Sequence, residues 1–236
     1  MNIFHYDSKP MQLLMYVGDL IILNVLYILC CLPVFTIGAA QAGLYSGVKV
    51  LDDPDDDSSP AKAFFKGFAN GFGKVTIAWG ILAVALAIVG VASAYTSVLN
   101  SVVTGLRVPM WVFAIPVIIV ALFISLVPIF HSQFDCKPMH LIRNCWFLLV
   151  GHPLRSIGVA LLIWLPVVVF LFNAYTFLAL LPAWIILYYG TAAVFAYKFM
   201  KKPFNTLIEY FAQQAQSDAE QLPAEGETAE ETVAGE

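Results

Sequence analysis

The stretch SIGVALLIWLPVVVFLFNAYTFLALLPAWIILYYGTAAVFAY, residues 156–197, decides the fold class of this chain. It holds 42 consecutive residues without Asp, Glu, Lys or Arg, and a second such run of 32 residues lies between Lys74 and Arg107. About 20 helical residues cross a hydrocarbon core of ~30 Å, and in lipid a helix satisfies its own backbone groups. The two runs therefore predict helices that span a membrane.

The composition of the whole chain agrees with this interpretation. Of its 236 residues, 60% are hydrophobic and 12% are charged, whereas soluble domains carry roughly 25% charged residues. A membrane β-barrel would need alternating segments of ~10 residues, and the long runs here are apolar on every face. We expect an all-α, polytopic transmembrane helical bundle with about five spans and additional interfacial amphipathic helices.

Five apolar segments are long enough to serve as spans. They lie at about residues 13–35, 75–97, 109–130, 156–174 and 178–198. We expect residues 1–205 to form the transmembrane domain and residues 206–236 to form an acidic C-terminal tail. The tail is rich in Ala, Glu and Gly and lacks aromatic residues beyond about residue 217, so we expect it to be largely disordered from there.

A helix break follows the first span. Pro33, Thr36 and Gly38 mark this break, because proline cannot continue a helical hydrogen-bond ladder and glycine weakens it. The apolar piece at residues 37–51 is too short to cross a bilayer alone. It is an extension of the first span, an interfacial helix or a re-entrant half-helix.

The orientation follows from the basic residues in the connections. Residues 38–74, 131–155 and 198–236 hold four, three and three Lys or Arg, whereas residues 98–109 hold one and residues 174–182 none. Lys and Arg accumulate in cytoplasmic connections. We therefore expect a multi-pass protein with its C-terminus in the cytoplasm. The N-terminus lies outside, unless residues 37–51 re-enter or cross the membrane, which would move it inside.

An amphipathic helix precedes the second span. Two serines followed by Pro60 form its start signal. Rings recur every four residues on one side and lysines lie on the other, which is typical of a helix at the membrane interface. The residues of this candidate interfacial helix are Phe64, Phe68, Phe72, Lys62 and Lys66.

The second span carries small residues along one face, at spacings that alternate between four and three. Small side chains let two helix backbones approach closely in lipid. We expect this candidate helix-packing face to contact another span. Its members are Thr76, Gly80, Ala83, Ala87, Gly90 and Ala94.

Two residues of the first span form a candidate intramembrane polar site. A carboxylate at the bilayer centre costs about 2.5–3.5 kcal/mol on insertion scales, so Asp19 is a candidate for relaying protons or binding a cation. Two structural readings compete, in which Asp19 sits at the outer interface or bonds a neighbouring helix. Asn24 lies deeper; we expect a hydrogen bond across helices, worth on the order of 1 kcal/mol, or a substrate contact.

Motifs for catalysis and metal binding are missing from the sequence. It contains no G-x-x-x-x-G-K-[ST], G-x-S-x-G or H-E-x-x-H. His131, Cys136, His140 and Cys145 lack the closely spaced cysteine pair of structural zinc sites. The acidic run at residues 52–57 lacks the Gly and Glu that an EF-hand requires. We expect no enzyme, no catalytic or metal-binding residues and no cofactor.

Several stretches resemble the YesL-like bacterial integral membrane proteins, the family called domain of unknown function 624. The resemblance rests on GDLIILN at residues 18–24, CLPVFTIG at 31–38, FFKGF at 64–68 and the pair His152-Pro153. It covers about residues 10–205. It implies a protein of the bacterial cytoplasmic membrane whose genes accompany carbohydrate uptake systems, and it implies no catalytic residue.

Two functions from different classes follow. The first is a non-enzymatic accessory or assembly component associated with bacterial carbohydrate uptake of the ABC type. The alternative is a small transporter or channel, acting alone or as a homo-oligomer, with Asp19, Asn24 and the break at Pro33 along its pathway. The expected partners are the lipid bilayer and either ABC sugar permease components or a second copy, and nucleic acid is not among them.

Overall fold

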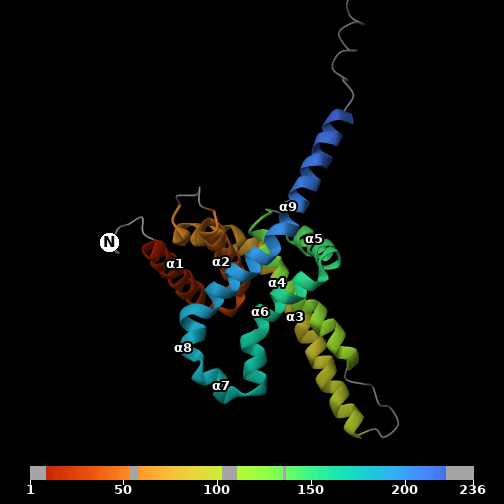
Figure 1. Ribbon diagram of the computed structural model, residues 1–236. Coiled ribbons are helices and arrows are strands. Elements are labelled where there is room, and N and C mark those ends of the chain that lie inside the picture. The colour runs from red at the N-terminus through yellow and green to blue at the C-terminus, as the bar shows by residue number, and fades with distance from the viewer. Residues whose placement is uncertain (1–8, 54–57, 103–110, 135–136, 222–236) are drawn as a thin grey trace, which may run out of the picture. The chain divides into compact units, whose positions relative to one another are not determined.

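The computed structural model describes residues 9–53, 58–102, 111–134 and 137–221, and within them every regular element is a helix (Figure 1). In chain order these are α1 (Lys9–Cys30), the 3-10 helix η1 (Val34–Thr36), α2 (Ile37–Leu51), α3 (Pro60–Val102), α4 (Trp111–His131), α5 (Pro138–Gly151), α6 (Pro153–Phe172), α7 (Ala174–Ala179), α8 (Leu181–Ala183), the π-helix η2 (Trp184–Tyr188) and α9 (Tyr189–Gln221).

Within the described part of the chain, five segments are long and apolar enough to cross a membrane. They are Met11–Cys30, Pro60–Ser101, Val112–His131, Pro153–Phe172 and Leu181–Glu209. The prediction of an all-α membrane protein with about five spans is confirmed. The chain divides into two compact units, Met1–Phe199 and Met200–Glu236. In the second unit α9 continues to Gln221, and residues 222–236, about half of the predicted acidic tail, lie outside the described residues.

α1 and α2 form an antiparallel hairpin. The turn between them contains Pro33, and the hydroxyl of Thr36 donates to the carbonyl oxygens of Cys30 and Pro33, each at 2.6 Å. Leu23, in the second half of α1, lies against Gly47 near the end of α2, so α2 runs back along α1. The beginning of α1 and the end of α2 therefore lie at the same end of the hairpin.

Burial decides between the three alternatives for residues 37–51. An extension of the first span is wrong, because the chain turns at Pro33 and α2 runs back along α1. An interfacial helix would expose one face, whereas ten of the 15 residues of α2 are buried and only Lys49 is exposed. The half-helix that returns toward its side of entry is the alternative that agrees with the structure.

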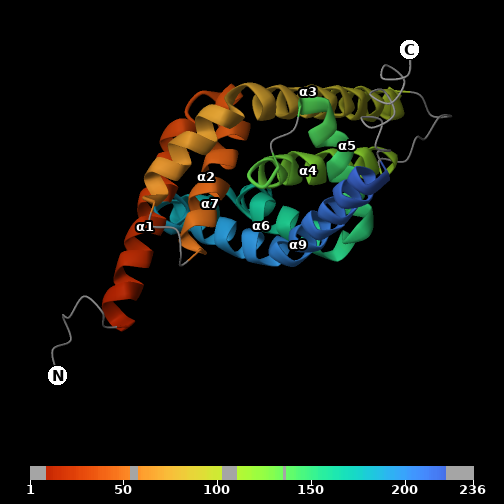
Figure 2. The same ribbon diagram turned by 90° about the horizontal axis from the view of Figure 1, so that it is seen from above.

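α3 is one continuous helix where the sequence predicts an interfacial helix followed by a separate span. Its first half packs along α2, and its second half lies beside α4 in both views (Figures 1 and 2). Phe64 is fully buried against Gly43 of α2, so the expectation that its ring faces lipid is corrected. α2 covers that side of α3, whereas Phe72 is exposed as expected.

α4 forms the centre of the first unit. Every residue from Leu122 to His131 is buried, and α4 contacts α2, α3, α5 and α6. The helix continues through Pro116 and Pro128. Because neighbouring helices surround its second half on several sides, α4 holds the hairpin and the later spans around one common core.

Candidate functional site

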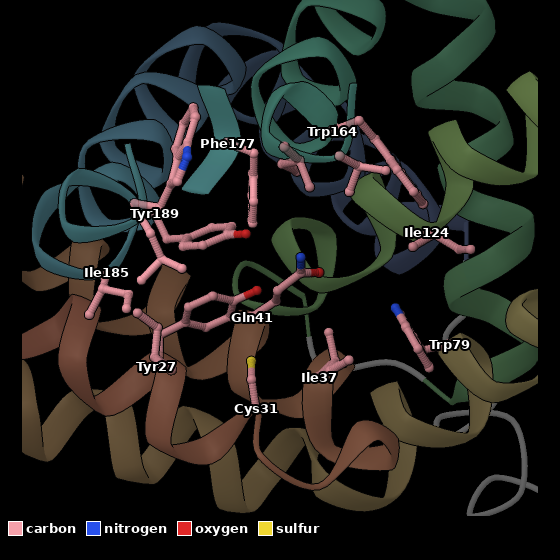
Figure 3. Close-up of a pocket in the computed structure, with 15 residues that line it drawn as sticks. Tyr27, Cys31, Ile37, Gln41, Trp79, Ile124, Trp164, Phe177, Ile185 and Tyr189 are labelled. Carbon is pink, nitrogen blue, oxygen red and sulfur yellow. The ribbon is translucent and has the colours of Figure 1, made fainter. Parts of the chain in front are cut away.

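A cavity of about 540 Å³ lies where the α1–α2 hairpin meets α3, α4, α6 and the segment from Phe177 to Tyr189 (Figure 3). Its volume falls within the range of small-molecule pockets, about 300–1,000 Å³. No residue that lines it is charged. Six aromatic side chains contribute to the lining: Tyr27, Trp79, Trp164, Phe177, Trp184 and Tyr189. We call this space the aromatic cavity.

The hairpin supplies one side of the aromatic cavity. Cys31 directly follows α1 and its backbone N–H donates to the carbonyl oxygen of Tyr27 at 2.9 Å, so these two residues lie one above the other. Ile37 and Gln41 are four residues apart on α2 and share one helical face. Figure 3 shows the side chains of Tyr27, Tyr189 and Gln41 all pointing into this space. The turn at Pro33 thus brings the end of α1 and the beginning of α2 to the same site.

Three polar atoms at the aromatic cavity have no hydrogen-bond partner among the described residues. They are Oε1 of Gln41 and the indole nitrogens Nε1 of Trp79 and Trp184. Gln41 and Trp184 are each only 8% exposed. A buried polar group without a partner costs about 1–3 kcal/mol. All three atoms are covered by neighbouring protein atoms, so a molecule in the cavity would reach them only after side chains move.

The indole of Trp164 provides a contrast within the same lining. Its Nε1 donates to the hydroxyl of Ser125 at 3.0 Å. That hydroxyl also donates to the carbonyl oxygen of Ala121 at 2.9 Å. Trp164 is therefore satisfied by α4, whereas Trp79 and Trp184 are not satisfied by the protein.

The π-helix η2 forms another wall. Its wide turn changes the usual backbone pairing, and π-helical segments occur frequently at functional sites. Asn24, which is fully buried, donates to the carbonyl oxygen of Ile185 and accepts from the backbone N–H of Gly190 at 2.8 Å. Its amide also lies 3.5 Å from the carbonyl oxygen of Trp184. Asn24 therefore satisfies backbone groups of this segment and fastens it to α1.

Two further features hold this wall in place. A Cβ atom on Gly190 would lie 3.0 Å from the carbonyl oxygen of Leu20, so glycine permits the close approach to α1. On the other side the hydroxyl of Tyr188 donates to the carbonyl oxygen of Leu162 on α6 at 2.6 Å. These contacts fix the position of Trp184 and Tyr189 at the aromatic cavity.

The two predicted intramembrane polar residues have different surroundings. Asn24 makes the expected interhelical hydrogen bonds, and it makes them with backbone atoms. Asp19 is half-buried, does not line the aromatic cavity and forms no hydrogen bond or ion pair with the described part of the chain. It lies four residues before Leu23, level with the end of α2, where Asp52 pairs with Lys198 at 3.6 Å. Asp19 thus lies near the charged end of the hairpin.

Pro33, Thr36 and Gly38, the residues of the predicted helix break, shape the aromatic cavity indirectly, by determining where the helices lie. Pro33 is exposed at the tip of the hairpin, and the hydroxyl of Thr36 closes the turn. A Cβ atom on Gly38 would lie 2.8 Å from Cβ of Trp79, so Gly38 lets α3 approach α2 and brings this indole to the aromatic cavity. None of the three lines the cavity.

The predicted packing face of α3 is largely unoccupied by the described part of the chain. A Cβ atom on Gly80 or on Gly90 would meet nothing within 4 Å, and Ala87 and Ala94 are exposed. Thr76 and Ala83 are half-buried. The interfacial lysines Lys62 and Lys66 are both exposed, and Phe68 is half-buried.

The structure adds no support for a metal site at His131, Cys136, His140 and Cys145. Cys136 lies outside the described residues, and within them no group of three or more His, Cys, Asp or Glu could hold a metal ion. His140 instead contacts Arg143, with 3.1 Å between Nδ1 and the guanidinium nitrogen.

Sequence reasoning missed the residues that form the aromatic cavity. Gln41 sits in a mostly apolar segment whose one charged residue is Lys49, and Trp79 and Trp184 sit within spans. A polar side chain and indoles at membrane depth were the available signal. The sequence could not show that three segments far apart in the chain meet at one place.

The helices and their apolar composition define this chain as an α-helical integral membrane protein. Residues 20–103 match the model of a family described as protein of unknown function, DUF624. The match confirms the suspected resemblance and covers the second half of α1 and all of α2 and α3, including Asn24, Gln41 and Trp79. No curated protein and no solved structure matches the chain significantly.

Proposed function

We propose that this protein is a non-enzymatic accessory or assembly component of ABC-type carbohydrate uptake in the bacterial cytoplasmic membrane. The observation that carries this proposal is the free small-residue face of α3. Gly80 and Gly90 meet no other part of the described chain, although such residues are the ones that let membrane helices pack closely.

The free face is long enough for a helix of another protein. From Gly80 to Ala94 it extends over about 20 Å at 1.5 Å per residue, which is most of the hydrocarbon thickness. Large apolar side chains are exposed beside it, among them Ile81, Ile88 and Val91. A partner helix would fit between these side chains, as in interfaces built on small residues.

The link to carbohydrate uptake rests on the resemblance to the YesL-like proteins. The resemblance is carried by the segment that contains both the hairpin and α3. An ABC permease is a membrane protein, so it can offer a helix at the same depth as the free face.

The experiment is site-specific photo-crosslinking in native membranes. A photoreactive residue replaces Ala87 on the free face, and the control replaces Leu161, an exposed residue of α6. We expect a crosslink from position 87 to a permease subunit and none from position 161. Gly90→Leu should abolish the crosslink while the protein stays folded. Crosslinks from position 87 to lipid alone, or to a second copy of this chain, would contradict the proposal.

The aromatic cavity favours a second candidate function, a small transporter that acts alone. The pathway of such a transporter would run through the aromatic cavity. Asp19 and Asn24, which the sequence placed along the pathway, do not line this cavity. Proteoliposomes that contain the purified protein test this function by uptake of labelled sugars. Uptake that falls in Gln41→Leu and persists in Asp19→Asn would support transport through the cavity. No uptake of any sugar would exclude this candidate.

A further inference from the structure

Helix α5 connects two spans and is too short to be a span itself. Its 14 residues cover about 21 Å at 1.5 Å per residue, which is less than the ~30 Å of a hydrocarbon core. The span before it ends at His131 and the span after it begins at Pro153. Figure 2 shows α5 lying across α4 rather than along it. α5 therefore stays on one side of the membrane, at the ends of the two spans that it connects.

The two faces of α5 have different surroundings. The helix contacts α3, α4 and α6, and it buries Leu141, Cys145 and Leu148 along one face. The opposite face is exposed although most of its side chains are apolar, and we call it the outer face of α5. Its members are Met139, His140, Arg143, Trp146, Phe147 and Val150. Exposed aromatic and apolar side chains next to a cation are typical of a helix that lies in the membrane interface.

Arg143 lies in the middle of the outer face. Met139 precedes it by four residues, and Trp146 and Phe147 follow it by three and four, so all three are its neighbours on the helix surface. The ring of Trp146 stacks on Phe123 of α4, with 6.0 Å between the ring centroids, which holds this side of the outer face in place. A charge among apolar side chains at the edge of the hydrocarbon needs an opposite charge.

The described part of the chain gives Arg143 no carboxylate partner. Residues 136–208 contain no Asp or Glu, and within the same stretch lie Lys137, Arg143, Arg155, Lys198, Lys201 and Lys202. An anion from outside the chain therefore complements this surface. At the depth of an interfacial helix the abundant anion is the phosphate of a lipid headgroup.

His140 adds a second hydrogen-bond donor for such a phosphate. Its Nδ1 lies 3.1 Å from a guanidinium nitrogen of Arg143. A guanidinium donates and never accepts, so Nδ1 is the acceptor and the proton of the neutral imidazole is on Nε2. The Nε2–H of His140 and the other N–H groups of Arg143 can then donate to the oxygens of one phosphate, and arginine binds phosphate with paired hydrogen bonds.

We propose that the outer face of α5 binds an anionic phospholipid of the phosphatidylglycerol class. The phosphodiester accepts hydrogen bonds from Arg143 and His140, and the acyl chains lie along Trp146 and Phe147. A phosphatidylcholine carries the same phosphate together with a quaternary ammonium, and residues 136–208 offer that ammonium no carboxylate. The site therefore prefers the lipid with a net negative charge.

Native mass spectrometry of the full chain measures this preference. The protein is stripped of lipid in detergent and titrated with phosphatidylglycerol or with phosphatidylcholine of the same acyl chains. We expect phosphatidylglycerol to bind at the lower concentration. Arg143→Gln should weaken its binding about tenfold, the effect of one charge-assisted hydrogen bond, and Arg143→Lys should recover part of the loss. Arg143 is exposed, so these variants keep the fold.

The matched control is Lys62→Gln, which removes the same charge from an exposed side chain in the first turn of α3 and should change the binding little. Equal losses in Arg143→Gln and Lys62→Gln would overturn the proposal, because they would show diffuse attraction only. Equal affinities for the two lipids would overturn it as well. If free glycerol phosphate displaces the lipid at an equal concentration, the ligand is a soluble phosphate and the lipid source is wrong.

A photoreactive residue in place of Phe147 tests the same face in native membranes. We expect it to crosslink to phospholipid, because Phe147 is exposed on the outer face. A crosslink to a protein instead of lipid would make the outer face a protein-docking surface and would overturn the proposal. This result is separate from the crosslink expected at position 87 on α3, so the lipid site and the proposed accessory function can fail independently.

Discussion

Two stripes of small residues lie next to each other in the sequence and have opposite surroundings. The first runs along α2 and contains Gly43 and Gly47, where an added Cβ atom would lie 2.8 Å from the carbonyl oxygen of Phe64 or 3.1 Å from that of Pro60. The second runs along α3 and contains Gly80 and Gly90, where an added Cβ atom would meet nothing within 4 Å.

The difference teaches that small residues permit a close helix contact but do not select the partner. The short connection between Leu51 and Pro60 forces α3 back along α2, so the first stripe is covered within the chain. α3 then extends past the tip of the hairpin, so the second stripe lies beyond the end of α2. The length of the connection between α2 and α3, rather than the amino-acid composition of the two stripes, therefore determines which stripe is packed within the chain and which is free.

The largest expected effect is on the packed stripe. Gly43→Leu should strongly destabilise the folded state in detergent, because its Cβ would lie 2.8 Å from a backbone oxygen that cannot move aside. Overpacking typically costs 1–3 kcal/mol, and a clash with backbone should reach at least the upper end, about 3 kcal/mol. Gel filtration and thermal unfolding measure it. Gly80→Leu is the control, and equal losses in both variants would remove the distinction between the stripes.

A smaller loss is expected from the contact that fastens the packed region to η2. Asn24→Leu removes two hydrogen bonds and leaves buried backbone groups of Ile185 and Gly190 unpaired. We expect a loss of about 2 kcal/mol in thermal or denaturant unfolding. Asp19→Asn, five residues earlier, should have no measurable effect, and an equal effect would mean that Asp19 has a structural partner.

The hairpin that carries the packed stripe also predicts which side of the membrane each end faces. Gln12→Cys and Asp53→Cys, in a background without the native cysteines, should react with an impermeant maleimide from the same side. Thr176→Cys, in the connection after α6, should react from the opposite side. Labelling of positions 12 and 53 from different sides would mean that α2 crosses the bilayer rather than returning.

The smallest expected effect concerns the free stripe. Gly80→Ala and Gly90→Ala should change stability by no more than about 0.5 kcal/mol, since the added methyl groups meet open space. The photo-crosslink from position 87 should nevertheless weaken, because a partner helix could no longer approach as closely. Unfolding curves and crosslinking yield are measured on the same preparations, and an unchanged yield would show that close approach is not required.

Particular residues show how far the sequence could be interpreted. The spans were predictable, because lipid acts on each segment separately and a charge-free run has one stable form there. The hydrogen bonding of Asn24 was also predictable in kind, since a buried amide needs partners. The role of Phe64 was not, because its ring looks suited to lipid until α2 is known to cover it.

The sequence by itself determined that this chain is a helical membrane protein, where its spans lie and where the helix breaks at Pro33. Only the tertiary structure decided that α2 returns along α1, that one stripe of small residues is covered while the other is free, and that Gln41, Trp79 and Trp184 line one cavity. The physical reason is the distance along the chain over which each interaction acts. Transfer into lipid and helix formation depend on neighbours within one segment, whereas a cavity and a packing contact depend on which distant segments come together.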